Sequence, residues 1–425
     1  MKYVSLNILG MVGISCYILA DTYFISMALG STGLAALNLS ISVYSVIHGV
    51  GLMLGIGGAS RYGILVSLEK ERRANIVFST AIRAGILTGF IFVLLGLFGS
   101  ELLAFILGAD QMTLPLTETY LKTILCFAPF FILNNILLAF VRNDHNPRLS
   151  MAAMLVGSLS NIILDYVFMF PLKMGMFGAA FATGLAPVIS IAVLLLHFSK
   201  RRKHKLAFQK VRLCWSLLPD MLRLGLSALI NELSSAVVLI TFNLVILGLE
   251  GNRGLAAYGI VANLALVVIA VFTGLAQGAQ PLISIYYGQN KTGLQKRVCR
   301  YALFTSLIIA GLIYLGVLIA GEEILAVFNH GEDPVISHLA KEGLMIYFLG
   351  FFFAGVNIVK AMYLSAAEAA GAALIISITR GFAIIIPAVL ILSNFQGMTG
   401  VWLSFVLTEL LVMLLAIRME TYSTF

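Results

Sequence analysis

The chain has 425 residues, of which 60% are hydrophobic and 11% are charged, and its formal net charge is +8. Soluble globular proteins carry roughly 45–50% apolar and about 25% charged residues, so this composition excludes a protein whose whole surface faces water. A mean hydropathy of +1.01 predicts an all-α integral membrane protein.

Apolar stretches long enough to cross a bilayer follow one another along nearly the whole chain. At about 20 residues per span, twelve helices account for its length. The first stretch continues through Asp21 and Phe24 without a small-residue cleavage site, so it is interpreted as a span and not as a signal peptide. The twelve predicted spans cover residues 4–29, 34–58, 74–98, 117–141, 150–170, 178–198, 221–249, 256–281, 299–320, 341–364, 372–393 and 398–418.

The basic residues gather in alternate connections, whereas the other connections carry mainly Asp and Glu. Arg142 and Arg148 follow the fourth span, a run of Lys and Arg fills 199–212, and further basic residues follow spans two and eight. The positive-inside bias therefore predicts that both termini are cytoplasmic, in the plasma (inner) membrane. Because the charges are dispersed, no nucleic-acid surface is expected. The four cysteines show no metal-binding or disulfide spacing.

Two short segments recur at a nearly constant offset. Residues 33–36 (GLAA) return at 254–257, and the pattern Gly-Met-X-Gly at 175–178 returns at 397–400. Offsets of 221 and 222 indicate a duplication, and six spans per copy make the copies parallel repeats around a central cavity. We expect an N-terminal lobe at 1–198, a basic cytoplasmic linker at 199–215 and a C-terminal lobe at 216–425, with pseudo-two-fold symmetry along the membrane normal.

Three spans of the first half bring polar side chains to a similar depth. Counting about 1.5 Å per residue from the outer ends, Asp21 lies ~12 Å deep, Asp165 ~8 Å and Thr183 ~9 Å. Asn161 shares a helix face with Asp165, and Pro187 cannot donate a hydrogen bond to the Thr183 carbonyl. Such an oxygen-only set fits a hard cation, and the two acids could instead share a proton. The structural alternative is that Asp21 caps a loop and Asp165 pairs with Lys173.

The equivalent positions of the second half have lost these acids, since Phe242 and Ile386 stand there. The intramembrane charges of the second half include Glu232 and Lys360. Either these two pair, or Lys360 reaches the cytoplasm and leaves Glu232 facing the cavity. His48 fits an interhelical hydrogen bond better than a proton relay. Candidates that either line the cavity or hold helices together are Asn134, Asn135, Gln277 and Gln280. Glycines at 55, 57 and 58 fit close helix packing.

The sequence resembles the multidrug and toxic compound extrusion (MATE) transporters over essentially its whole length. The segments that carry the resemblance are 21–24 (DTYF), Gly30, 33–36 (GLAA), 175–182, 277–282 (QGAQPL) and 287–288. The resemblance implies two six-helix lobes and export of large, mostly cationic compounds against Na⁺ or H⁺. In the branch with its ion site in the N-terminal lobe, the site residues match Asp21, Asn161, Asp165 and Thr183, and Tyr17 and Tyr120 match neighbouring positions. Other members carry an Asp on span ten, but the nearest equivalent position here is close to Ala354. Glu232 on span seven matches the residue that accompanies this Asp in those members.

We therefore expect a monomeric secondary antiporter that exports organic compounds through a lipid-embedded bundle, with no cofactor other than its coupling ion. A flippase for lipids or lipid-linked oligosaccharides is the alternative, but it would favour additional spans and several cavity arginines. An intramembrane enzyme would need a nucleophile with its base, or metal ligands, and the sequence offers neither motif. A receptor would not require a duplicated bundle.

Overall fold

The computed structural model describes residues 2–199, 205–210, 214–328 and 334–422, and every regular element among them is helical. Only helices and closed barrels satisfy all backbone hydrogen bonds within a bilayer, which is why the apolar runs fold in this way. The helices are α1 (Lys2–Ser67), α2 (Glu71–Ile106), α3 (Leu114–Cys126), α4 (Ala128–Asn143), α5 (Pro147–Met169), α6 (Gly175–Ser199), α7 (Leu218–Gly288), α8 (Thr292–Phe328), α9 (Pro334–Tyr347), η1 (Phe348–Gly350), α10 (Phe351–Ala366), α11 (Ala370–Ile378), the π-turn η2 (Thr379–Ala383) and α12 (Ile385–Tyr422).

The number of spans follows from the breaks inside the longest helices. Among the described residues, eight helices are long and apolar enough to cross a membrane, or nine when α3 and α4 count as one bent span. Three of these contain a glycine with positive φ, namely Gly30, Gly251 and Gly397, where the chain reverses between antiparallel spans. Glycine adopts this conformation without the steric cost that a Cβ would bring. Nine helices with three such reversals make twelve spans in the described chain.

The duplication is visible in the backbone as well as in the sequence. Gly30 has φ 63° and ψ −153°, and Gly251, 221 residues later, has φ 61° and ψ −146°. Gly175 and Gly397, 222 residues apart, have φ values of 58° and 57°. The turns between equivalent spans therefore use the same local conformation.

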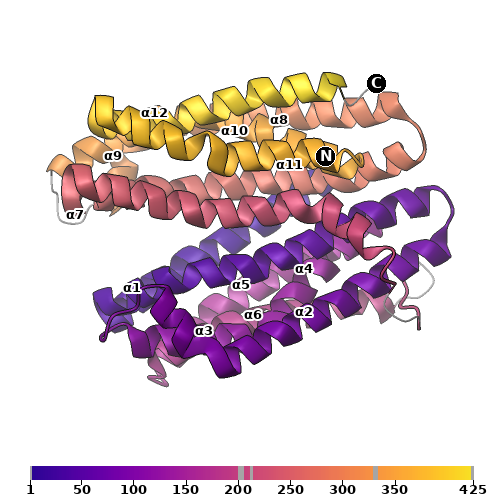
Figure 1. Ribbon diagram of the computed structural model, residues 1–425, viewed down its shortest axis with the longest axis horizontal. Coiled ribbons are helices and arrows are strands. Elements are labelled where there is room, and N and C mark those ends of the chain that lie inside the picture. The colour runs from indigo at the N-terminus through magenta and orange to yellow at the C-terminus, as the bar shows by residue number, and fades with distance from the viewer. Residues whose placement is uncertain (1, 200–204, 211–213, 329–333, 423–425) are drawn as a thin grey trace.

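Figure 1 shows two helical bundles lying side by side, α1 to α6 in indigo to magenta and α7 to α12 in the later colours of the bar. Both chain ends lie toward the same end of the molecule, which we call the terminal end. The exact limits 1–198 and 216–425 of the two lobes stay predictions.

The lobes meet most closely toward the terminal end. A Cβ added to Gly57 would collide with the Met221 carbonyl, and one added to Gly225 with the Met53 carbonyl. Gly274 likewise lies against the backbone of Ile8. Of the glycines predicted to allow close helix packing, Gly57 lets the backbones of α1 and α7 touch, whereas Gly55 lies against the α4 backbone at Asn135 and Gly58 against the Phe140 ring.

Two predicted spans are less regular than the hydropathy pattern suggests. The fourth breaks at Phe127, where α3 and α4 meet at 49°, because Pro129 in the first turn of α4 has no N–H for a continuous helix. The eleventh contains the π-turn η2. Some residues of the charged connections lie outside the described residues, namely the basic residues at 200–203 and 212 and the acids Glu332 and Asp333.

Candidate functional site

Asp21 is held inside the N-terminal lobe by the close packing of α1 on α5. Cβ atoms at Gly10 and Gly13 would lie 2.7 Å from Met154 Sδ and Leu155 Cδ2, so neither position has room for a side chain. Asp21 lies three turns beyond Gly10 on the same face of the helix. Its side chain is 6% exposed and is therefore directed at the neighbouring spans rather than at a loop.

Helices α5 and α6 supply the remaining polar groups. Asn161 and Asp165 are fully buried and Thr183 is 4% exposed. The Asn161 amide satisfies both neighbours when its nitrogen donates to Asp165 Oδ2 over 3.1 Å and its oxygen accepts from the Thr183 N–H over 3.3 Å. At Gly157 a Cβ would lie 3.2 Å from the Ala186 carbonyl oxygen, which shows how closely the two helices approach.

The two acids lie close enough to act on one another and on a shared tyrosine. Asp21 contributes electrostatically to the environment of Asp165, and Tyr120 interacts with both acids and with the Thr183 hydroxyl. Tyr17 interacts with Asp21, and its hydroxyl lies 3.1 Å from that of Tyr44. The structure thus brings the four predicted ion-site residues and both predicted neighbours into one cluster.

Two carboxylate oxygens in this cluster have no hydrogen-bond donor. Asp21 Oδ1 and Asp165 Oδ1 are buried and unpartnered in the described structure. An unpartnered buried charge is costly in low dielectric, so the pocket is chemically suited to a proton or a small cation. The alternative in which Asp165 pairs with Lys173 is not what the described residues show, because no ion pair joins them.

Glu232 faces the other lobe instead of pairing with Lys360. Its Oε2 lies 3.5 Å from His48 Nδ1, with 35% and 22% of the two side chains exposed. The His48 ring stacks on Tyr44 at 5.8 Å. The suggested pair of Glu232 with Lys360 is therefore wrong, and Glu232 and His48 join the two lobes.

Gln277 and Gln280 are buried in contacts that hold helices together. Arg142 donates from Nη1 to Asn7 Oδ1 over 2.7 Å and to Gln277 Oε1 over 3.1 Å. Gln280 donates to Ser60 Oγ over 3.0 Å. The sequence predicts Arg142 in the connection after the fourth span, but it lies in the last turn of α4, is only 3% exposed and bonds across the lobes at the terminal end.

Asn134 and Asn135 are neighbours on α4 of the N-terminal lobe. Asn134 is partly buried, and its Oδ1 has no partner among the described residues. Asn135 is 8% exposed and donates to the His48 carbonyl at 3.5 Å, a long hydrogen bond. Asn135 therefore holds helices together, and Asn134 stays a cavity candidate.

The C-terminal lobe holds a buried charged pair whose acid, Glu409, sequence reasoning missed. Arg380 Nε donates to Glu409 Oε1 over 2.6 Å, and Asn357 donates to Glu409 Oε2 over 2.7 Å. Glu409 is 2% exposed and Asn357 is fully buried. A single acid within an apolar run is the signal that could have identified Glu409. The positions 221 residues after Asp21 and Asp165 carry Phe242 and Ile386, neither of which is acidic.

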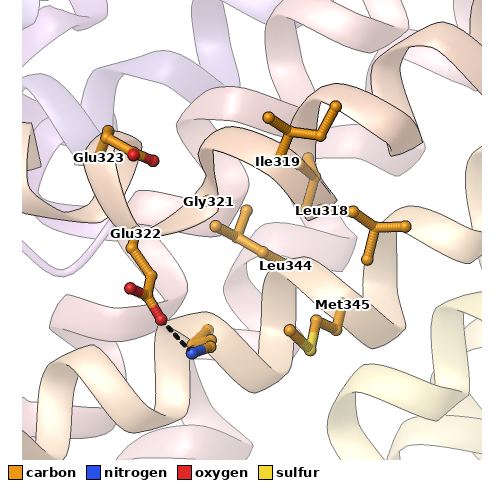
Figure 2. A pocket seen from close by; sticks show the side chains of 9 residues that line it. Leu318, Ile319, Gly321, Glu322, Glu323, Leu344 and Met345 are labelled. Atoms are coloured by element: carbon orange, nitrogen blue, oxygen red, sulfur yellow. Dashed lines mark hydrogen bonds and ion pairs between the residues drawn. The ribbon is translucent and has the colours of Figure 1, made fainter.

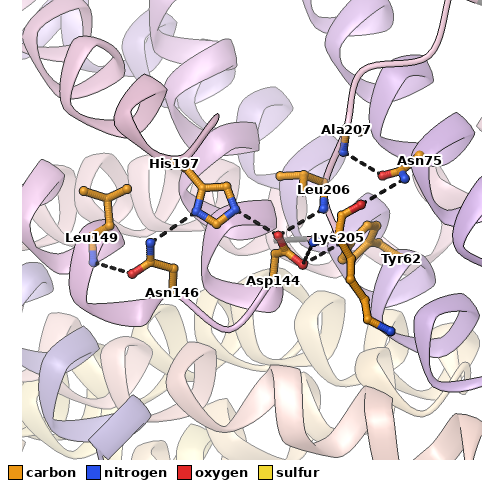
Figure 3. A network of polar contacts seen from close by, with 9 residues as sticks. All are labelled: Tyr62, Asn75, Asp144, Asn146, Leu149, His197, Lys205, Leu206 and Ala207. Carbon is orange, nitrogen blue, oxygen red and sulfur yellow. Dashed lines mark hydrogen bonds and ion pairs between the residues drawn. The ribbon is translucent and has the colours of Figure 1, made fainter. Parts of the chain in front are cut away.

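A second missed cluster fixes the linker to the N-terminal lobe (Figure 3). Asp144 bonds to His197 Nε2 over 2.9 Å, and the Leu206 N–H donates to Asp144 Oδ2 over 3.1 Å. Asn75 bonds to linker backbone on both sides, accepting from Ala207 N–H and donating to the Lys205 carbonyl. Residues 205–207 of the linker are therefore attached to the first lobe.

Comparison with known proteins adds the family. The MatE family model matches residues 7–167 and 228–390, which is well over half of the chain and covers both lobes. The chain belongs to the MatE family. Membership makes this MatE protein a multi-pass membrane transporter and not an enzyme.

Curated relatives of this MatE chain are similar over nearly its full length. It is 27% identical over 406 residues to the multidrug export protein MepA of Staphylococcus saprophyticus, and 29% identical over 408 residues to MepA of Staphylococcus aureus strain MSSA476. In both cases 94% of this chain and 88% of the relative are covered.

Solved structures establish the fold of this MatE chain. An outward-facing multidrug resistance MATE family transporter matches with a TM-score of 0.92 at 22% identity, covering 99% of this chain and 95% of that one. A MATE structure in complex with MaL6 matches with a TM-score of 0.94 at 21% identity and the same coverage. The predicted fold class, twelve transmembrane helices in two six-helix lobes, is confirmed.

Proposed function

We propose that the protein exports organic, cationic or amphipathic compounds in exchange for Na⁺ or H⁺ by alternating access. The curated relatives are multidrug export proteins, which supports the cargo class. The observation that carries the coupling is the pair of buried acids, Asp21 and Asp165, each with an oxygen that lacks a donor. A flippase is not favoured by these relatives.

The coupling ion acts through the repulsion between the two acids. Two carboxylates in a low-dielectric pocket disfavour each other's charge, and an arriving proton or cation relieves this. The set of two acids, the Asn161 amide and the Thr183 hydroxyl offers only oxygen ligands, which hard cations prefer. The ion changes the equilibrium between lobe arrangements to the extent that its affinity differs between them.

The contacts between the lobes support alternating access. The collisions that a Cβ would cause at Gly57 and Gly225, and the Arg142 bonds, all lie toward the terminal end. We propose that the protein lies in the plasma membrane with both termini in the cytoplasm. Because the contacts between the lobes lie at the same end as the termini, this arrangement is closed on the cytoplasmic side. We propose that the second arrangement separates these contacts and opens that side to cargo.

The cargo site is proposed near the Glu232 and His48 contact, where the lobes meet. Glu232 keeps 35% of its side chain exposed, and Tyr44 packs edge-on against Phe131 with ring centroids 5.4 Å apart. A carboxylate beside aromatic faces suits an organic cation. We propose that a monomer carries out the whole cycle.

The test is export by purified protein in proteoliposomes under an imposed Na⁺ or H⁺ gradient, each applied alone. Asp21→Asn and Asp165→Asn should each reduce gradient-driven export of a cationic dye by about tenfold or more, the effect expected of a lost charged ligand. Glu101→Gln, an exposed acid on α2, is the control and should export normally. Unchanged coupling in both Asp variants would refute the assignment.

A further inference from the structure

A groove outside the proposed transport site lies between α3 and α6. Its volume is about 480 Å³. None of the residues that line it belongs to the acid cluster or to the contacts between the lobes. The lining residues are Pro115, Glu118, Thr119, Lys122, Thr123, Cys126, Phe127, Phe177 and Phe181.

The groove opens away from the second lobe. Glu118 and Lys122 share one face of α3, whereas Tyr120 lies on the opposite face, 4% exposed and directed at the acids. On α6, Phe177 and Phe181 are one turn apart, and Thr183 points the other way. The inner faces of α3 and α6 are therefore directed at the acid cluster, and their outer faces are directed at the bilayer. The neighbouring helix α2 also has a bilayer-facing side, where Phe98 is 85% exposed.

The inner part of the groove is aromatic. Phe127 and Phe181 pack edge-on with ring centroids 5.7 Å apart, and Phe177 stacks on Phe181 at 5.5 Å. Phe127 stands at the break between α3 and α4, where the two helices meet at 49°. An acyl chain that packs against these aromatic rings removes apolar surface from water.

The outer part carries two opposite charges in a fixed order. Glu118 lies one turn nearer the end of the bundle than Lys122, about 6 Å along the axis, and Phe127 lies about 7.5 Å deeper. An acid four residues before a lysine is well placed to pair with it. Nevertheless, no ion pair or hydrogen bond of either side chain is found in the described structure, so both charged groups remain available to a ligand.

We propose that this groove binds a phospholipid whose head group ends in a primary ammonium. In such a lipid the ammonium lies farther out than the phosphate, which matches Glu118 outside and Lys122 inside, with an acyl chain along Phe127, Phe177 and Phe181. A primary ammonium donates hydrogen bonds to a carboxylate, whereas a trimethylammonium has no N–H to donate. The groove therefore distinguishes phosphatidylethanolamine from phosphatidylcholine and from anionic phosphatidylglycerol.

A pocket at the same end of the second lobe provides the contrast. It is lined by residues of α8 and α9, including Glu322, Glu323 and Leu344. There Lys341 Nζ donates to Glu322 Oε1 over 2.5 Å; Figure 2 shows Glu322 and Glu323 among the side chains that line this pocket. Because Lys341, the one cation among the lining residues, is paired with Glu322, this pocket offers no free ammonium to a lipid phosphate, although the carboxylate of Glu323 remains.

The experiment is native mass spectrometry of the detergent-purified full chain, titrated separately with phosphatidylethanolamine, phosphatidylcholine and phosphatidylglycerol of identical chains. Wild type should retain phosphatidylethanolamine with an affinity roughly threefold or more above the other two, as expected for a partly exposed ion pair. Glu118→Gln and Lys122→Gln should each remove this preference. Glu322→Gln and Lys341→Gln, the matched controls of the second lobe, should keep it.

A charge swap makes the test independent of folding defects. Glu118→Lys combined with Lys122→Glu retains both charges but reverses their order, and the thermal unfolding midpoint without lipid verifies that the variant is folded. Loss of the phosphatidylethanolamine preference in the folded swap supports the site. The proposal is overturned if the swap binds phosphatidylethanolamine as wild type does. It is also overturned if wild type binds all three lipids equally well, or if wild type retains detergent and none of the lipids.

Discussion

Asp144 illustrates how a single buried charge is accommodated in this protein. It follows the last residue of α4 and accepts hydrogen bonds from the Tyr62 hydroxyl over 2.9 Å and from the Leu206 N–H over 3.1 Å. Burial acts to raise the pKa of Asp144, but the hydrogen bonds from His197, Leu206 and Tyr62 outweigh it, so the pKa lies below its ordinary value of 3.8. The charged form is therefore the one that stabilises the fold.

Replacing this acid should weaken attachment of the linker in a pH-dependent way. Asp144→Asn should lower the free energy of unfolding by about 1.5–3 kcal/mol near neutral pH, the usual range for hydrogen bonds to a charged group. Because the folded-state pKa is depressed, this stabilisation is fully present above 3.8 and is lost as the pH falls through the folded-state value.

The measurement is the unfolding midpoint of wild type and Asp144→Asn in detergent from neutral pH down to about 3. The difference between the two should shrink below pH 3.8. Glu250→Gln, an exposed acid at the opposite end of the bundle, should show no such difference. A gap between wild type and Asp144→Asn that stays constant to the lowest pH would contradict the account.

At the scale of elements, the π-turn η2 explains how Arg380 is accommodated inside a membrane lobe. The turn spans Thr379–Ala383 and lies where a Cβ on Gly381 would collide with Ser234 of α7. A π-turn shifts the direction of side chains relative to a regular helix and is often found at functional positions. Here it lets α11 pack against α7 while Arg380 bonds to Glu409 on α12.

The Arg380 and Glu409 pair should behave as one unit in stability measurements. Arg380→Met leaves a buried carboxylate without its counter-charge and should cost about 3–5 kcal/mol. Adding Glu409→Leu should restore most of this loss, because an apolar pair of similar volume has no charge to desolvate. A double-mutant cycle of unfolding free energies checks this, and a double variant no more stable than the Arg380→Met single variant would disprove it.

For the whole molecule, the arrangement of the lobes depends on backbone contacts between α1 and α7. Gly57 lies where any side chain would collide with the Met221 carbonyl. Interiors this tightly packed respond to one added methyl group with a shift costing about 1–3 kcal/mol. Such an energy is enough to change the populations of two arrangements several-fold.

Gly57→Ala should therefore separate the lobes at the terminal end. Glu69 and Asn290 are exposed there, in equivalent turns of the two lobes, so spin labels at these positions report the separation after the four native cysteines are replaced. The distance distribution should shift to longer values in Gly57→Ala. Gly259→Ala, whose Cβ would meet no atom within 4 Å, is the control, and identical distributions in both variants would rule out the proposed role of Gly57.

The sequence by itself determined the membrane class, the number of spans and the duplication, because apolar length and repeat offsets are local properties of the chain. It also placed Asp21, Asp165 and Thr183 at a similar depth, since the rise per residue of a helix can be counted from its ends. Their clustering agrees with that count, while their role in ion coupling stays a prediction.

Only the tertiary structure decided which polar groups meet. Arg142 bonds to Gln277, 135 residues away, and Glu232 turned out to face His48 rather than Lys360. The Glu409 pair and the attachment of the linker at Asp144 were equally unforeseen. The reason is that hydropathy fixes how deep a residue lies but not the direction in which its side chain points around the helix axis, and this direction is set by packing between helices distant in sequence.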